Sequence, residues 1–281
     1  MALPASGAIS LSQVSVELGA GATSTRSLND STTRTLFGVA SGAISMSNGY
    51  GKANAFAFAV ASNVTNANLR TLAVNAGWNG TSELTCTLNS GIYFISSAVG
   101  TAGLTINGSF PGGVTFVNNG IVVGDHGDGG GGAAWAGSGG GGGTGGLALL
   151  IQSAVSIQNN GTIAGGGGGG GGGGSGRGTN SNGDSYFPQT GGSGGRGKSV
   201  SGPLGGSAGT SRTIGKTTFR GGTGGTGGQW GASGGGGGSG VGNSAGGGGK
   251  PGGGGGGGGA ATSGQSNVTW LATGSRFGSL G

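Results

Sequence analysis

Two short segments of the chain carry residue types that could do chemistry. The first, GSGGRGKS at residues 192–199, matches the Walker A pattern, in which backbone amides and a lysine bind phosphate. That motif works between a strand and the N-terminus of a helix. Here the sequence VSGP at 200–203 follows, and its glycine and proline break helices. In a chain this rich in glycine such matches arise by chance, so we expect no nucleotide site.

The second segment is Asp125-His126-Gly127-Asp128, which holds the only histidine of the chain. Two carboxylates and one imidazole are too few ligands for a complete metal site, so we interpret the segment as a polar turn. Cys86 is the only cysteine, which rules out an intrachain disulfide. No set of residues suits catalysis. We therefore expect a protein that is not an enzyme and needs neither a metal nor a cofactor.

Glycine dominates what remains, with 84 of the 281 residues, and most of it lies between residues 124 and 262. Uninterrupted runs occupy 165–174 and 252–259. Such a run is a flexible linker when isolated, because it loses much entropy on ordering and buries little apolar surface. Extended helices with three residues per turn can instead pack so closely that only a hydrogen atom fits between them, as in collagen.

Charge is sparse and unevenly distributed. Charged residues make up 6% of the chain, and the net charge is +6. Beyond residue 129, eight basic residues occur with a single acid, Asp184. This pattern favours anionic partners such as phosphorylated glycans or nucleic acid. The N-terminus does not resemble a secretory signal, and the longest apolar run, 147–151, is too short for a membrane span, so we expect synthesis in a cytoplasm.

Residues 1–54 contain an internal echo, SGAISLS at 6–12 and SGAISMS at 41–47. Both copies alternate apolar and small polar residues, which predicts two short strands. Between them, the SLND sequence at 27–30 is expected to cap a helical turn that reaches Phe37. The segment is too small for a robust core of its own, so we expect it to dock on a partner.

Residues 55–123 have the pattern of a β protein. Alternating apolar positions recur about every ten residues between Gly, Asn and Ser, which predicts a β-sandwich or a β-solenoid. The sequence at 114–124 echoes that at 155–165, and both give a strand, an Asn-Asn-Gly turn, a short strand and then glycine. Residues 268–274 are expected to form a closing strand that returns to the β domain.

The glycine-rich region is not uniform. Islands of aromatic and basic residues interrupt the glycine runs, as loops would between straight rods. A rod of ten residues in the polyproline-II form is about 31 Å long. We expect several rods to stack side by side with the islands as their turns, and the apolar segment 147–151 to cover one face.

Three features together resemble a known group. The sequence AISLSQVSVELG at 8–19, the SLND segment and the second SGAIS copy are similar to the start of many tail and receptor-binding proteins of tailed bacteriophages. The glycine-rich region resembles the distal long-tail-fibre adhesins of T-even-like phages. In that family polyglycine-II helices form a lattice, and loops at its tip bind the bacterial receptor. The tail-type N-terminus distinguishes the chain from these adhesins. The position of the protein on the virion, at the tail tip or at the tip of a fibre, therefore stays open.

The resemblance implies a mostly β fold in four parts: a tail-attachment segment (1–54), a β-rich domain (55–123), a packed polyglycine-II domain with receptor-facing loops (124–262) and a closing strand (263–281). Attachment to other tail or fibre proteins is assigned to Ile9, Leu11, Ile44 and Met46. Receptor binding is assigned to Tyr186, Phe187, Arg196, Lys198, Arg212, Lys216, Phe219, Arg220 and Trp230. An alternative interpretation of Trp135 and Trp230 is that they only cap the rods and do not contact a receptor.

The implied function is that of an adhesin on the distal tail of a virion, released by lysis, which recognises an outer-membrane protein or glycan without inserting into the membrane. Two other classes stay open. A structural or ice-binding polyglycine protein predicts strict Gly-x-x periodicity, which the irregular islands do not show. A glycine-rich nucleic-acid-binding protein predicts dense repeated arginines, which are also missing.

Overall fold

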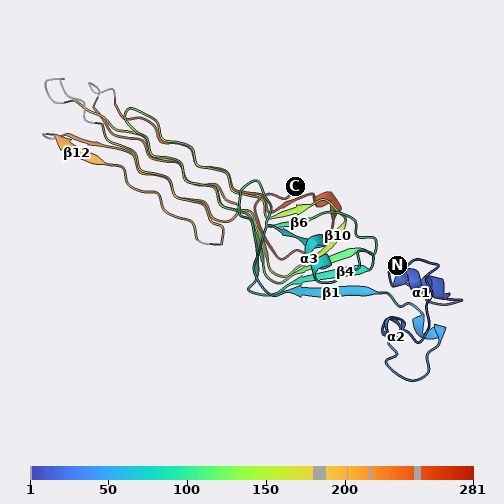
Figure 1. Ribbon diagram of the computed structural model, residues 1–281. Helices are drawn as coiled ribbons and strands as arrows, with labels where there is room; N and C mark the ends of the chain where they lie inside the picture. The colour runs from blue at the N-terminus through green and yellow to red at the C-terminus, as the bar shows by residue number, and fades with distance from the viewer. Residues whose placement is uncertain (1, 180–187, 201, 215–216, 244–247) are drawn as a thin grey trace.

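The computed structural model describes residues 2–179, 188–200, 202–214, 217–243 and 248–281. The molecule is elongated, and its three parts follow one another along the long axis (Figure 1). Short helices near the N-terminus lie at one end, parallel sheets occupy the middle, and long glycine-rich segments extend from the sheets to the opposite end. The two ends of the molecule are therefore built from different segments of the chain.

The N-terminal echo forms helix starts and not the strands predicted at 6–12 and 41–47. Helix α1 (Leu11–Glu17) and the 3-10 helix η1 (Met46–Gly49) each begin at a serine of the echo. The Ser10 hydroxyl accepts from the Gln13 amide at 3.2 Å, and Gln13 Oε1 accepts from the Ser10 amide at 2.7 Å. This reciprocal capping box satisfies two amides that a helix end otherwise leaves free. Helix α2 (Ser31–Phe37) confirms the helical turn expected after the SLND segment.

The N-terminal part has a small hydrophobic core of its own. Three of the four residues assigned to attachment contribute to it. Ile9 is buried, while Ile44 and Met46 pack against the cluster. The buried members are Leu3, Ile9, Val14, Leu36 and Phe37.

Three parallel sheets form the middle of the molecule, and successive strands pass from one sheet to the next. The first sheet contains β1 (Ala55–Val60), β4 (Glu83–Leu88), β7 (Val114–Asn118), β10 (Val155–Asn159) and β15 (Val268–Ala272). The second contains β2 (Val64–Thr65), β5 (Tyr93–Ile95), β8 (Ile121–Val123), β11 (Thr162–Ala164) and β16 (Ser275–Phe277). The third contains β3 (Ala67–Asn68), β6 (Leu104–Ile106), β9 (Leu149–Ile151) and β14 (Thr262–Ser263). Helix α3 (Leu69–Asn75) and the 3-10 helix η3 (Gln265–Asn267) lie between strands.

The chain therefore winds as a coil, and each of its first four turns contributes one strand to each of the three sheets. This arrangement favours the solenoid interpretation over a sandwich of antiparallel sheets. The two echoing segments occupy the same place in successive coils, because Phe116 of β7 pairs with Ile157 of β10. Their first asparagines are buried and stacked, with Asn118 Nδ2 donating to Asn159 Oδ1 at 2.7 Å. Strand β15, near the C-terminus, continues the stack by pairing with β10.

The glycine-rich segments leave the coils twice and return, so the predicted range 124–262 is interrupted. Strands β9, β10 and β11, within residues 149–164, belong to the sheets. The apolar residues of β9 therefore line the core of the coil and do not cover the glycine segments. Within the described residues the extended segments, here called rods, are 124–134, 137–148, 165–179, 188–200, 202–210, 220–229, 232–243 and 248–261.

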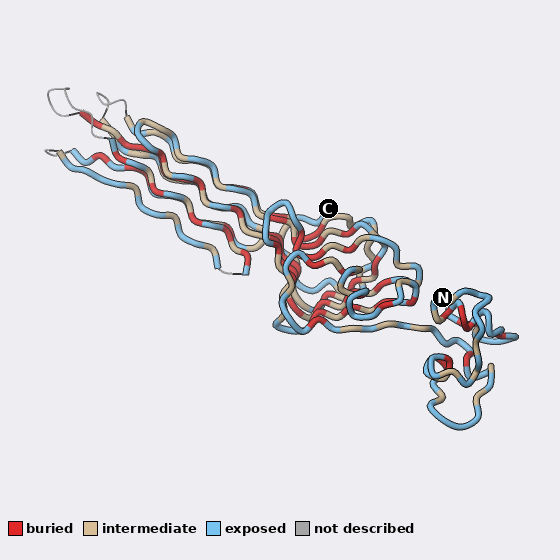
Figure 2. The backbone as a smooth tube through the Cα atoms, viewed as in Figure 1, coloured by how far each residue is buried: buried red, intermediate tan, exposed pale blue. Residues whose placement is uncertain are grey.

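The rod that begins at 165 is surrounded by other rods. Its amides donate in a period of three: Gly168 and Gly171 donate to the rod at 232–243, Gly169 donates to that at 137–148, and Gly170 donates to that at 188–200. Its carbonyls accept from three further rods with the same period, at 124–134, 220–229 and 248–261. Residues 165–174 are all buried, and a buried strip follows the rods in Figure 2.

The sequence of the central rod permits its burial. An uninterrupted glycine run has no side chain on any face, and the run 165–174 is the central rod. Rods with the pattern x-Gly-Gly place one side chain per turn on the outside. In the rod 220–229 the exposed residues are Arg220, Thr223, Thr226 and Gln229, three residues apart.

Candidate functional site

The end of the molecule farthest from the N-terminus carries an antiparallel hairpin, β12 (Ser211–Ile214) and β13 (Thr217–Arg220). Figure 1 shows it at the distal tip of the rods. Arg212 and Arg220 are both exposed there. The hairpin therefore presents two of the predicted binding residues away from the sheets.

Phe219, in the same hairpin, is not a surface residue. Its side chain is 1% exposed, although its sequence neighbours are polar and basic. The ring lies against Gly178, where an added Cβ would overlap it. Phe219 thus holds the hairpin to the rod at 165–179, which corrects the expectation of an external role.

Trp135, for which the sequence suggests only a role in capping the rods, is 68% exposed and is a further binding candidate. It sits in the turn between the rods 124–134 and 137–148. The turn is fixed by hydrogen bonds from the Gly137 amide to the Ala134 carbonyl and from the Ser175 hydroxyl to the Gly137 carbonyl. Ala136 has a φ of 60°, which is costly outside glycine. The isolated AAWAGS island, at 133–138 between glycine segments, is the signal that could have identified it.

Arg196, Lys198 and Trp230 lie near the sheets, far from the distal hairpin. Trp230 Nε1 donates to the Ser199 carbonyl at 2.6 Å, and the Trp230 ring stacks at a tilt on Phe277 of β16 with centroids 5.9 Å apart. Lys198 Nζ lies 4.0 Å from the centroid of the Trp230 ring, a cation–π contact. These contacts are those of a residue that caps the rods, the alternative that the sequence left open.

If Trp230 caps the rods, its replacement by alanine lowers stability without changing adsorption. Loss of the ring contacts and of one hydrogen bond should reduce the free energy of unfolding by about 2–4 kcal/mol. Thermal unfolding of the purified variant measures the loss, and phage adsorption measures binding. A large adsorption defect with unchanged stability would instead place Trp230 in the binding surface.

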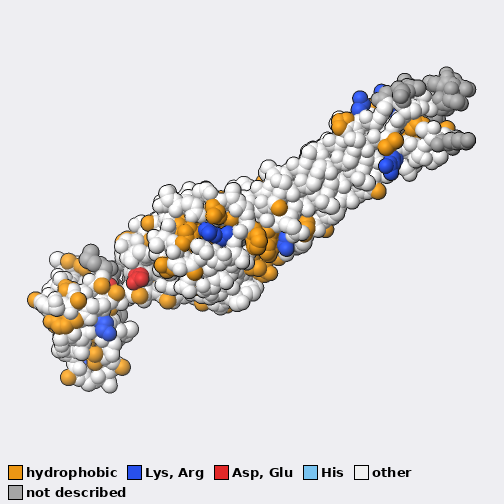
Figure 3. Space-filling model, turned by 180° about the vertical axis from the view of Figure 1, so that it is seen from behind, with side chains coloured by type: hydrophobic (Ala, Val, Ile, Leu, Met, Phe, Trp, Pro, Cys, Tyr) orange, Lys and Arg blue, Asp and Glu red, His pale blue; other side chains and the backbone are white. Residues whose placement is uncertain are grey.

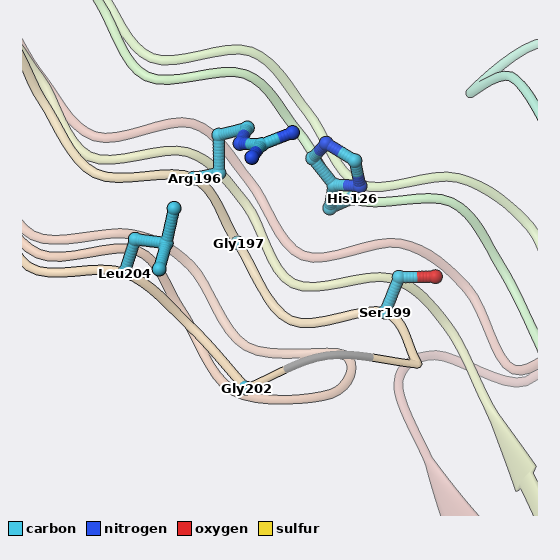
Figure 4. A pocket seen from close by; sticks show the side chains of 6 residues that line it. All are labelled: His126, Arg196, Gly197, Ser199, Gly202 and Leu204. Carbon is cyan, nitrogen blue, oxygen red and sulfur yellow. The ribbon is translucent and has the colours of Figure 1, made fainter.

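A cavity of about 200 Å³ opens beside these residues. Figure 4 shows the side chains of His126 and Arg196 pointing toward each other at its edge, with Leu204 nearby. His126 Nδ1 lies 2.8 Å from Asp125 Oδ1, and His126 Nε2 lies 3.7 Å from Asp128 Oδ1. In the described part of the chain no three His, Cys, Asp or Glu side chains form a group suited to a metal ion.

Positive charge is concentrated away from the N-terminus. Among the described residues every acidic side chain lies at or before Asp128, whereas basic side chains continue to Arg276. Seen from behind, basic side chains gather near the distal end of the rods (Figure 3). Three further predicted binding residues, Tyr186, Phe187 and Lys216, lie outside the described residues.

The N-terminal part exposes a different surface. Leu11 is 38% exposed and Val16 is 47% exposed, both on α1. Val16 also lines a hollow of about 220 Å³ together with Leu3 and Pro4. Leu11 is thus the one predicted attachment residue on an outer face, and Val16 joins it.

Two further observations concern the chemistry of the whole chain. Burial raises the pKa of the Cys86 thiol to about 12, so the thiol stays protonated and unreactive at neutral pH. Among the helices that the structure describes, none has the length and hydrophobicity of a membrane span.

Comparisons with known proteins point to one family. The sequence profile of the family described as phage tail fibre adhesin Gp38 matches residues 55–281. The chain is also similar to a chain of the crystal structure of the gp37-gp38 adhesin tip complex of the bacteriophage S16 long tail fibre. The two chains share 21% sequence identity with a TM-score of 0.49, and the match covers 89% of this chain and 91% of the other. No curated protein sequence matches the chain.

Proposed function

Because the chain belongs to the Gp38 family of phage tail fibre adhesins, we propose that it contacts the bacterial surface with the distal ends of its glycine-rich rods. Family membership makes the protein a receptor-binding adhesin of a bacteriophage tail, and it replaces the ice-binding and nucleic-acid-binding alternatives. An adhesin acts by binding, which agrees with the expectation that the chain is not an enzyme.

The observation that carries this proposal is the separation of the two ends. The N-terminal helices lie at one end of the molecule, and the hairpin β12–β13 lies at the other (Figure 1). A protein attached to the virion by its N-terminal part would project the hairpin toward the host. Arg212, Arg220 and Trp135 all lie on turns or hairpins between rods. Tryptophan and arginine are the residue types that most often dominate binding energy at interfaces.

We further propose that the rods are polyglycine-II helices. Three observations support this: the hydrogen bonds repeat every third residue, each turn of the central rod donates to three neighbouring rods, and its carbonyls accept from three more. Lateral bonds of this kind satisfy backbone groups that an isolated glycine run would leave free. Such a scaffold is rigid without a large apolar core, and loops on a rigid scaffold can vary freely.

The N-terminal residues 1–54 are proposed to attach the adhesin to another tail or fibre protein. The family profile begins at residue 55, where β1 starts, so the N-terminal helices lie outside the shared part. The exposed apolar side chains of α1, Leu11 and Val16, give this part a surface that a partner can cover. The boundary at residue 54 between the attachment segment and the β-rich domain is also a proposal.

An adsorption experiment tests the location of the binding end. Phage carrying Trp135→Ala, and phage carrying Tyr186→Ala with Phe187→Ala, should adsorb to host cells about 10- to 30-fold more slowly, the effect of losing one or two interface anchors. The matched control is Leu271→Ala, which removes another exposed apolar side chain, 57% exposed, from strand β15 of the sheets. Its adsorption should equal that of the parent phage.

A third variant separates the two ends of the rods. Arg196→Ala with Lys198→Ala changes the end near the sheets. Normal adsorption of this phage, together with the defects above, supports the distal end. The reverse pattern, a defect in this variant and none in the distal ones, would contradict the proposal.

A further inference from the structure

A groove runs along one side of the distal half of the rods. Its volume is about 390 Å³, and residues of the rods 202–210, 220–229 and 232–243 line it together with Ser211. The middle rod forms the floor, since it hydrogen-bonds to both others: Gly224 donates to the Ser207 carbonyl, and Gly238 donates to the Thr223 carbonyl. The volume lies in the range of sites for small ligands and exceeds what a single ion needs.

The polar side chains that line this groove have no hydrogen-bond partner among the described residues. The Arg220 guanidinium makes no ion pair or hydrogen bond there, in contrast to Arg212, which does interact. The hydroxyls of Ser211, Thr223 and Ser239 also bond to no described residue. One cation and three hydroxyls thus point to a ligand that offers both an anionic group and several hydroxyls.

The walls of the groove carry few side chains. Gly209, Gly222 and Gly238 line it, so a ligand can approach the backbone closely. In the described chain the amides of Thr223 and Ser239 donate no hydrogen bond and add two more donors. Phe219 precedes Arg220 in the chain but does not line the groove, and its ring is buried against Gly178.

We propose that this groove binds an anionic sugar, meaning a hexose ring that carries a phosphate or a carboxylate. The proposal rests on the proposed function and names the receptor chemistry for one surface of the distal end. A guanidinium binds either anion through two parallel hydrogen bonds. The serine and threonine hydroxyls then pair with the hydroxyls of the ring.

A protein receptor or a nucleic acid suits the groove less well. Interfaces with proteins depend on aromatic anchors and the pockets that receive them, and this groove contains no aromatic side chain among the described residues. Nucleic acids are bound by many cations that neutralise successive phosphates, whereas the described lining of this groove holds one, Arg220.

The test is a titration of the isotope-labelled full chain, followed by NMR, with glucose 6-phosphate, glucuronate, glucose and inorganic phosphate. We expect saturable shifts of the Thr223 and Ser239 amides with both anionic sugars at a Kd of about 1 mM, as befits one ring. Glucose and inorganic phosphate should bind at least tenfold more weakly.

Variants locate the site. Arg220→Gln and the isosteric Thr223→Val should each weaken binding of glucose 6-phosphate about tenfold. Lys52→Gln removes an exposed charge from the N-terminal part and should leave binding unchanged. No saturable shift up to about 50 mM, or equal binding of glucose or of inorganic phosphate, would overturn the proposal. If that happens while Trp135→Ala phage still adsorb slowly, the distal binding end stands and the sugar assignment alone fails.

Discussion

Replacing Gly169 by alanine or valine is expected to disrupt the whole bundle of rods. A Cβ at this position would lie 1.8 Å from the Asp128 carbonyl oxygen and 2.4 Å from its carbonyl carbon. The obstacle is backbone, so no side chain can rotate away to relieve it. Asp128 cannot retreat alone, because its carbonyl accepts from Gly143 of the next rod. Overpacking an ordinary core costs about 1–3 kcal/mol, and here we expect about 4 kcal/mol or more.

Gly254→Ala is the matched control. Gly254 lies in another glycine run, is exposed, and would place a Cβ in open space. Since alanine restricts the unfolded chain more than glycine, this variant should be neutral or up to about 1 kcal/mol more stable. Calorimetry and hydrogen exchange of amides 165–174 check both variants. Equal stability of Gly169→Ala and Gly254→Ala, or free-peptide exchange of those amides in the parent protein, would show that the rods are not packed.

The coil of strands could be predicted in outline because its signals are local. The alternation in β4 and β7 and the repeated Asn-Asn-Gly turn mark strands that stack in register. Around Ser10 and Ser45 the local pattern is misleading. Their surroundings alternate with a period of two, yet Gln13 and Asn48, three residues later, complete capping boxes. Over so few residues the period of a strand and the period of a helix cannot be told apart. The side-chain hydrogen bonds of the capping boxes therefore decide that helices form.

The exposure and position of the candidate binding residues are harder to predict, because they depend on contacts between distant rods. Phe219 has polar neighbours in sequence and is buried only because Gly178, on another rod, leaves room for its ring. Trp135 and Trp230 both occupy short islands, but they lie at opposite ends of the rods. Rods that run back and forth place alternate turns at alternate ends. The chain leaves the sheets at 124 and at 165, and the turns that follow each exit lie first at the distal end and then at the end near the sheets. Counting them from these exits places Trp135 at the distal end and Trp230 at the end near the sheets.

Deleting residues 1–54 is expected to remove the adhesin from the virion entirely. The deletion ends just before β1, so the coil and the rods keep all their strands and hydrogen bonds. The buried cluster around Val14 and Phe37 is separate from the core of the sheets, so its removal leaves that core intact. The fragment should stay soluble and unfold cooperatively, while purified virions contain none of it and adsorption falls at least 100-fold.

A pair of substitutions in the full chain separates attachment from folding. Leu11→Asp with Val16→Asp places charges at two exposed positions of α1, neither of which belongs to the small core. Burying a charge against an apolar partner costs several kcal/mol, so incorporation should fall at least tenfold with unchanged thermal unfolding. Val74→Asp, on helix α3 and 47% exposed like Val16, is the control that should be incorporated normally. Immunoblots of purified virions measure all three proteins. Normal incorporation of both the deletion and the double variant would show that the adhesin attaches through the sheets or the rods.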